Sequence, residues 1–142
     1  MIKTGPIIII EDDRDDQYIL EEAITDLKIE NKLVFFGNCP DALRFLETTT
    51  EQPFLILSDV NLPGMNGTEL RYIINNNEFL RKKSIPFVFF STTATKDAVE
   101  EAYELMVQGY FEKPNKMAEI KKYLKLMFDY WQICLHPNSD FK

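Results

Sequence analysis

Acidic, hydroxyl and basic side chains stand within two residues after the ends of four short apolar runs in this sequence. They are Glu11 and Asp12 after the first run, Asp59 after the third, Ser91 after the fourth and Lys113 after the fifth. Each has an ordinary explanation when taken alone, because acids cap helices, hydroxyl groups start turns and lysines are solvated. Carboxylates, a hydroxyl and an ammonium group facing one small space would instead suit phosphoryl transfer, which needs positioned charges and little else.

The three acids would also require a cation if the fold brings them together. Glu11, Asp12 and Asp59 would repel one another within a few ångströms. Oxygen ligands completed by water suit Mg²⁺, which keeps several waters in an octahedral shell. A carboxylate left partly free beside the metal and a lysine could attack a phosphorus atom and form an aspartyl phosphate.

The elements that would position these residues alternate between apolar runs and segments of helical periodicity. Strands are predicted over Ile7–Ile10, Leu33–Phe36, Phe54–Leu57, Phe87–Phe90 and Gly109–Phe111. A helical segment follows each run; the third is expected to fray at Asn75–Asn77, and the last covers Met117–Cys134. Such alternation predicts a parallel sheet with helices on both faces, and ligands of such sheets bind beyond the carboxyl ends of the strands.

Composition narrows the class of protein. The 142 residues predict a single domain over 1–142, with a core of about 5–134 and a mobile tail over 135–142. A net charge of −7 disfavours nucleic acid or an anionic membrane as a partner, and no apolar run approaches the ~18 residues of a membrane span. Cys39 and Cys134 form neither a disulfide framework nor a zinc motif, so we expect a cytoplasmic protein with packed cysteines.

Four stretches together resemble the receiver domain of two-component response regulators. They are Ile7–Asp13 (IIIIEDD), Leu57–Gly67 (LSDVNLPGMNG), Ile85–Ser91 (IPFVFFS) and Tyr110–Pro114 (YFEKP). The resemblance runs from residue 7 to about 130. It implies a flavodoxin-like (βα)5 fold, a doubly wound parallel sheet of strand order 2-1-3-4-5. It also implies a protein that catalyses only its own phosphorylation and dephosphorylation.

The resemblance assigns a metal site and a phosphoacceptor residue by residue. Asp59, two residues before the LPGMNG turn, resembles the phosphoacceptor. Asp12 matches the acid that binds Mg²⁺ directly, and Glu11 the acid that binds it through water. The backbone carbonyl of Asn61 is implied as a further ligand.

The resemblance also implies a switch. Ser91 matches the hydroxyl that hydrogen-bonds the phosphoryl group, Lys113 matches its paired lysine, and Tyr110 matches the aromatic residue that turns inward. The bond between Lys113 and Pro114 is expected to be cis, which is essentially a proline geometry.

Departures from the family pattern are few. Glu11 replaces the commoner Asp, Ser91 replaces the commoner Thr, and Thr92 stands where Ala is usual. A longer fourth strand would let Thr92 or Thr93 supply the hydroxyl, although we favour Ser91.

The expected partners are proteins. Few residues follow the last helix, so the chain resembles a stand-alone receiver whose output is contact with an unknown downstream protein. The only histidine, His136, is expected in the tail, so the phosphoryl group would come from a separate histidine kinase or phosphotransfer protein.

The last helix carries more apolar surface than one face of a sheet can cover. Tyr123, Leu126, Tyr130 and Ile133 lie outside both its polar arc and its expected sheet-facing side. The tail or the fourth helix could cover these residues. The alternative that we carry forward is a symmetric homodimer through them.

Three other functions fit part of the pattern. A haloacid-dehalogenase-like phosphatase needs a second acid two residues after the nucleophile, where Asn61 cannot donate a proton. A flavodoxin-like electron carrier needs a phosphate-binding loop after the first strand, but residues 11–16 read EDDRDD. A pseudo-receiver that binds partners without phosphorylation remains open.

Overall fold

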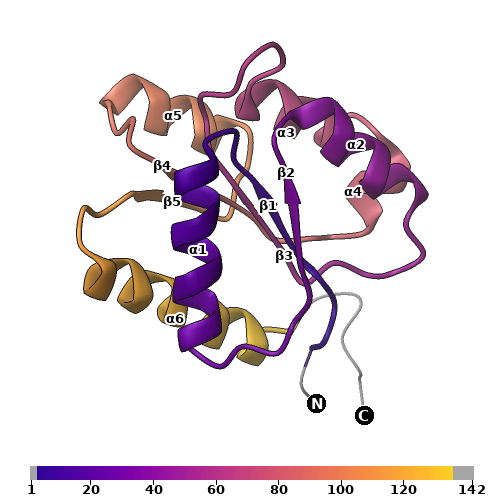
Figure 1. The fold of residues 1–142 in the computed structure, drawn as a ribbon. Helices are drawn as coiled ribbons and strands as arrows, with labels where there is room; N and C mark the ends of the chain where they lie inside the picture. The colour runs from indigo at the N-terminus through magenta and orange to yellow at the C-terminus, as the bar shows by residue number, and fades with distance from the viewer. Residues whose placement is uncertain (1–2, 136–142) are drawn as a thin grey trace.

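The computed structural model describes residues 3–135, which form a central parallel sheet between two layers of helices (Figure 1). The strands are β1 (Ile7–Ile10), β2 (Leu33–Phe36), β3 (Leu55–Ser58), β4 (Phe87–Ser91) and β5 (Gly109–Glu112). Their order is β2-β1-β3-β4-β5, with every neighbouring pair parallel. This arrangement confirms the predicted doubly wound, flavodoxin-like fold.

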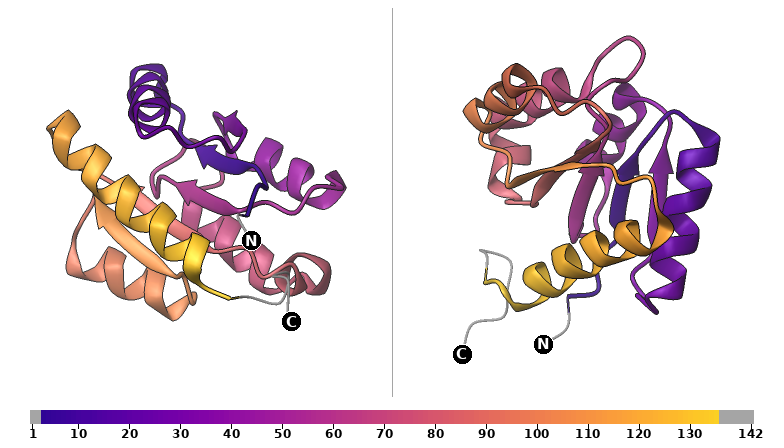
Figure 2. Two further views of the ribbon diagram at one scale, coloured as in Figure 1. Left: turned by 90° about the horizontal axis from the view of Figure 1, so that it is seen from below. Right: turned by 90° about the vertical axis from the view of Figure 1, so that its left-hand side faces the viewer.

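Helices cover both faces of the sheet, as the two further views in Figure 2 show. They are α1 (Arg14–Asp26), α2 (Cys39–Thr48), α3 (Gly67–Asn75), α4 (Glu78–Lys82), α5 (Lys96–Glu104) and α6 (Met117–Ile133). The helix α4 was not predicted, because five residues are too few to show a helical period. Its N-cap, Asn77, lies in the stretch where fraying was expected, and the Asn77 side chain accepts a hydrogen bond from the backbone N–H of Leu80. The Leu80 side chain is buried. None of the helices described over residues 3–135 has the length and apolarity that crossing a membrane requires.

The strand ends lie slightly further along the chain than the apolar runs predict. The third strand begins at Leu55 rather than Phe54 and includes Ser58, which pairs with Ile10 of β1. The fourth extends to Ser91. The last residue of each of these two strands is therefore polar, because the backbone hydrogen bonds between strands do not depend on side-chain polarity.

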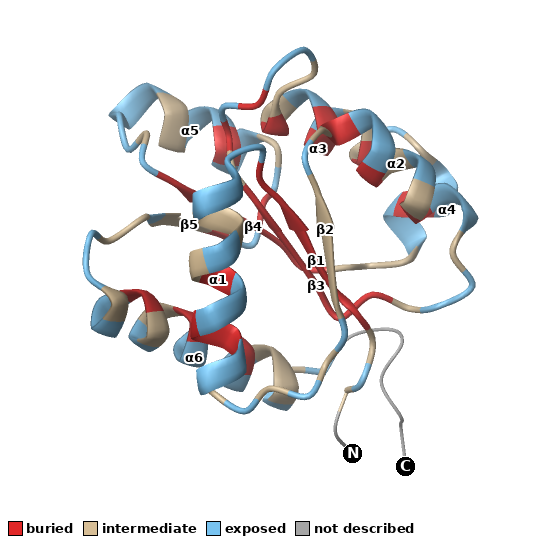
Figure 3. Ribbon diagram, viewed as in Figure 1, coloured by how far each residue is buried: buried red, intermediate tan, exposed pale blue. Residues whose placement is uncertain are grey.

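Two apolar clusters, one on each face, hold the sheet between its helices. All four isoleucines of β1 are at most 1% exposed. Ile8 and Ile10 belong to the cluster with α2, α3, α4 and α5, and Ile7 and Ile9 to the cluster with α1 and α6. Figure 3 shows the buried strands between the helical layers. A strand covered on both faces gains from apolar residues at every position, which explains the unbroken isoleucine run.

The outer face of α6 is largely uncovered. Leu126, Tyr130 and Ile133 are 56%, 59% and 81% exposed, as their pattern predicts. Tyr123 differs, because its ring packs against Phe111 of β5 with 5.7 Å between ring centroids, leaving it half-buried. The edge of the sheet therefore covers one of the four residues for which no cover was expected. The predicted tail over residues 136–142 lies outside the described residues.

The start of the described chain is fastened to the end of α6. The Lys3 ammonium donates hydrogen bonds to the carbonyls of Trp131, Gln132 and Cys134 at 2.9, 2.9 and 2.6 Å. The backbone of Lys3 also exchanges two hydrogen bonds with the Gln132 amide, both at 2.9 Å. A cation at the carboxyl end of a helix offsets its negative dipole end, so Lys3 caps α6.

Candidate functional site

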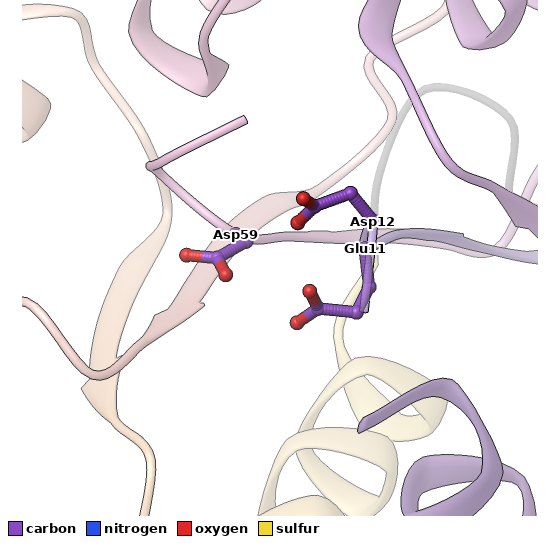
Figure 4. Close-up of side chains that lie close together, drawn as sticks. All are labelled: Glu11, Asp12 and Asp59. Atoms are coloured by element: carbon purple, nitrogen blue, oxygen red, sulfur yellow. The ribbon is translucent and has the colours of Figure 1, made fainter. Parts of the chain in front are cut away.

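Three carboxylates meet at the carboxyl ends of β1 and β3 (Figure 4). Glu11 and Asp12 follow β1 directly, Asp59 follows β3 directly, and the two strands are neighbours in the sheet. One oxygen from each carboxylate lies within 4.8 Å of the others. Glu11 is buried, Asp12 is exposed and Asp59 is half-buried. The structure therefore brings together the three acids that the sequence singled out.

Lys113, which follows β5, reaches into this cluster. Its ammonium donates to the Glu11 carboxylate and lies 3.4 Å from oxygens of both Asp59 and Asp16. Asp16 was not predicted as a neighbour of Lys113. Asp13 caps α1 by accepting from the backbone N–H of Asp15 and Asp16, so Asp16 lies in the first turn of the helix that follows β1. The sequence did contain one indication of this contact, because Asp16 stands three residues after the helix-capping Asp13.

Burial and charge act together on these groups. Burial raises the pKa of the Glu11 carboxyl, although the neighbouring Lys113 ammonium opposes that rise. Burial lowers the pKa of Lys113, but its hydrogen bond to Glu11 and the charges of Asp59, Glu11 and Asp16 more than offset this and raise it. Lys113 thus stays protonated at neutral pH. Three carboxylates, those of Glu11, Asp16 and Asp59, lie around this one ammonium group, and Asp12 adds a fourth acid to the cluster, so the site can accept a further cation.

The backbone holds the Asp59 carboxylate in one orientation. Its Oδ1 atom accepts hydrogen bonds from the backbone N–H of Val60 and Asn61, at 2.7 and 3.3 Å. Its Oδ2 atom is the one that faces Lys113. One carboxylate oxygen is therefore occupied by the turn, whereas the other faces the charged centre.

Two glycines shape the turn after Asp59. Gly64 has φ +73°, a left-handed conformation that side chains disfavour. At Gly67 a Cβ atom would lie 2.5 Å from the Asp59 carbonyl oxygen and 2.6 Å from the Phe89 ring. Any larger residue at Gly67 would push the turn away from the Asp59 backbone.

Thr93 connects the loop after β4 to three surrounding residues. The Asn61 amide donates to its hydroxyl, the Tyr110 hydroxyl donates to its carbonyl, and its own N–H donates to the Ser91 hydroxyl at 3.2 Å. Ser91 is fully buried at the end of β4. Burial raises the pKa of the Tyr110 phenol, which therefore remains a hydrogen-bond donor.

The expectation of a cis bond between Lys113 and Pro114 is wrong: this peptide bond is trans. The trans isomer is favoured by about 0.5–1 kcal/mol in X–Pro bonds. Lys113 reaches Glu11 with the trans bond while its backbone N–H donates to the Ser91 carbonyl at 2.8 Å. The cis geometry is therefore not needed to place the lysine.

The residues present fit a hard divalent cation. Three carboxylates supply oxygen donors within ligand distance of one another, and such donors favour Mg²⁺ over softer metals. A cavity of about 220 Å³ adjoins Lys113 and Asp16, but its lining also includes Leu20, Phe90 and Ile120 and does not include the three clustered acids. The site can thus combine a metal, an acidic nucleophile and an ammonium group.

Comparison with known proteins finds one family that matches most of this chain. Residues 7–125 match the family described as "Response regulator receiver domain". The "Response regulator Rcp1" of Synechocystis sp. (strain ATCC 27184 / PCC 6803 / Kazusa) is 29% identical over 130 residues, which are 88% of this chain and 87% of that protein.

Two solved structures have the same fold. The phosphorylated cyanobacterial phytochrome response regulator RcpA superposes with a TM-score of 0.84 and 25% identity, over 96% of this chain and all of RcpA. The Mn²⁺-bound form of Rcp1 superposes with a TM-score of 0.78 and 27% identity, over 93% of this chain and 97% of Rcp1.

Proposed function

The chain belongs to the response regulator receiver domain family of two-component signalling, and on that premise we propose that it is a phosphorylation-dependent switch. Asp59 accepts a phosphoryl group from a histidine kinase or a histidine phosphotransfer protein in a Mg²⁺-dependent reaction. The observation that carries this proposal is the meeting of Glu11, Asp12 and Asp59 at one point, where the Lys113 ammonium contacts Glu11 and Asp59. The phosphorylated state of RcpA and the Mn²⁺ bound to Rcp1 support it.

The carboxylates of Asp12 and Asp59 and the carbonyl of Asn61 are the proposed direct Mg²⁺ ligands, and Glu11 is proposed to hold the ion through water. When bound, Mg²⁺ supplies positive charge to the oxygens of the transferred group. Asp59 is the nucleophile: its turn-bound oxygen fixes the carboxylate, and the other oxygen forms the new P–O bond while the P–N bond to the donor's histidine breaks and leaves its electron pair on that imidazole. Lys113, already 3.4 Å from that second oxygen, pairs with the new phosphoryl charge.

The switch runs through the loop after β4. Ser91 donates a hydrogen bond from its hydroxyl to a phosphoryl oxygen, which changes the hydrogen bond that this hydroxyl accepts from Thr93. Thr93 also accepts from Tyr110 and Asn61, so a shift of this loop alters all three contacts. The helix α5 begins three residues later, at Lys96, and its equilibrium between conformations shifts with the loop.

The deciding experiment is the intact mass after incubation with acetyl phosphate and Mg²⁺. One phosphoryl adduct is expected in the wild type and none in Asp59→Asn or in EDTA. The matched control is Asp13→Asn, which removes a neighbouring acid that caps α1 and should retain the adduct. An adduct that persists in Asp59→Asn would mean that another acid is the acceptor. A folded wild type with no adduct from acetyl phosphate or from a phosphorylated kinase would instead indicate a pseudo-receiver.

The proposed partners are a kinase that docks near α1 and the site loops, and a downstream protein. We also propose a symmetric homodimer through α6, now centred on the exposed Leu126, Tyr130 and Ile133 and flanked by Tyr123. Sedimentation equilibrium should detect a dimer that Leu126→Glu dissociates. A strict monomer at high concentration, with and without phosphorylation, would rule it out.

A further inference from the structure

A second cavity, termed the hollow, lies at the end of the strands opposite to the acidic site. Its volume is about 330 Å³, at the lower end of the ~300–1,000 Å³ typical of small-molecule sites. Pro86 and Gln108, which line it, directly precede β4 and β5. The hollow therefore opens at the amino ends of the strands, whereas Asp59 and Lys113 lie beyond their carboxyl ends.

A buried positive charge forms part of the wall of this hollow. Arg71 of α3 is 8% exposed, and its guanidinium carbon lies 5.4 Å from the centroid of the Phe87 ring. Its Nε and Nη2 atoms donate to the carbonyls of Leu105 and Met106 at 3.1 and 2.8 Å. Over residues 3–135 no carboxylate lies within ion-pair distance of Arg71. Helix-end carbonyls supply only about half an elementary charge, so the guanidinium charge is incompletely compensated.

The remaining lining fits the same type of ligand. Arg81 of α4 adds a second guanidinium, and the lining found among the described residues contains no acid, although the whole chain carries −7. Leu80, Ile85 and Trp131 contribute apolar surface. Two guanidinium groups favour an anion, and the apolar walls favour one that carries a hydrocarbon body over a bare inorganic ion.

We propose that this hollow binds a small monocarboxylate with an apolar tail. The carboxylate pairs with Arg71 and Arg81, and the tail contacts Leu80, Ile85 and Trp131. Because Arg71 also holds the carbonyls at the carboxyl end of α5, such a ligand acts on the helix that follows the phosphorylation-site loop. The binding itself does not depend on phosphorylation of Asp59.

The test uses the single tryptophan of the sequence, Trp131, as its reporter. Its fluorescence is titrated with hexanoate, with neutral hexanamide and with acetate. Hexanoate should give a saturable change, and hexanamide and acetate should bind at least tenfold more weakly. Arg81→Gln, an exposed substitution, should weaken hexanoate binding several-fold. The control Arg44→Gln removes an arginine that pairs with Asp41 outside the hollow and should leave the affinity unchanged.

A second measurement guards against an unstable variant. Arg71→Gln should weaken hexanoate further, and if it unfolds, the amide NMR signals of Leu105 and Met106 in the wild type replace it. These signals should shift with hexanoate and not with hexanamide. Equal affinity for the acid and its amide, no saturable binding, or unchanged affinity in the Arg81 variant would overturn the proposal. Binding that occurs only in Asp140→Asn would assign the hollow to the chain's own C-terminal segment and would overturn it as well.

Discussion

Replacing Lys113 by methionine should destabilise the fold strongly, because it leaves a buried carboxylate without a counter-ion. The Lys113 and Glu11 side chains are only 10% and 3% exposed. At the 3.4 Å separating Lys113 from Asp59, one ion pair is worth about 5 kcal/mol at an effective dielectric constant of ~20. The cost of desolvating lysine offsets part of this. Breaking a buried pair from one side typically costs about 3–5 kcal/mol, or roughly 10–15 °C in Tm at this chain length.

Urea and thermal unfolding, followed by far-UV circular dichroism at neutral pH, measure this loss. Adding Glu11→Gln to Lys113→Met should restore at least half of the lost stability, since the buried charge is then gone. Excess Mg²⁺ should also stabilise Lys113→Met more than the wild type, by compensating the same carboxylates. The matched control Lys116→Met removes an exposed lysine and should change stability by no more than about 0.5 kcal/mol. The reasoning fails if Lys113→Met stays within 1 kcal/mol of the wild type, or if the double variant is no more stable than the single one.

Three further predictions concern other parts of the fold. Burial raises the pKa of the Cys39 thiol to about 12. A disulfide reagent at pH 8 should therefore modify only the half-exposed Cys134 until the protein unfolds. Two rapidly reacting thiols in the folded protein would contradict this prediction. Gly67→Ala should lower the free energy of unfolding in urea by at least about 2 kcal/mol, because the new Cβ atom would lie 2.5 Å from the Asp59 carbonyl oxygen. The control Gly37→Ala, where a Cβ atom would meet open space, should not lower it. Lys3→Ala should speed hydrogen exchange in the last turn of α6 while leaving α1 unchanged, and equal acceleration in both helices would point to global destabilisation instead.

The sheet could be predicted because its strands lie inside the protein on both faces. Buried parallel strands appear as continuous apolar runs, and the four isoleucines of β1 show this most clearly. The ends of β3 and β4 could not be predicted, because Ser58 and Ser91 join their ladders through backbone hydrogen bonds that no apolar pattern marks. The short helix α4 was missed for a related reason: its one buried residue, Leu80, establishes no period.

For the candidate site, the parallel sheet places Glu11 and Asp59 at one edge. The same reasoning places Lys113 beside them, whereas its pairing with the phosphoryl group came from the family resemblance, because periodicity says nothing about what a side chain contacts. Asp16 and Arg71 were not predicted, since each depends on tertiary contacts with residues distant in sequence. The prediction of a cis bond before Pro114 was wrong for a different reason. It came from the family resemblance, but this bond has the ordinary trans form.

The cap that Lys3 places on α6 has a consequence for synthesis on the ribosome. Its hydrogen bonds join residues 128 to 131 positions apart, so they form only after almost the whole described chain has been made. At about 5–20 residues per second, Lys3 is made some 6–26 s before its partners. The adjacent β1, which is all isoleucine, also lacks β3 until residue 58 has emerged. The nascent chain therefore carries its most apolar strand next to a segment that still lacks its α6 partners, and a chaperone would bind most usefully there.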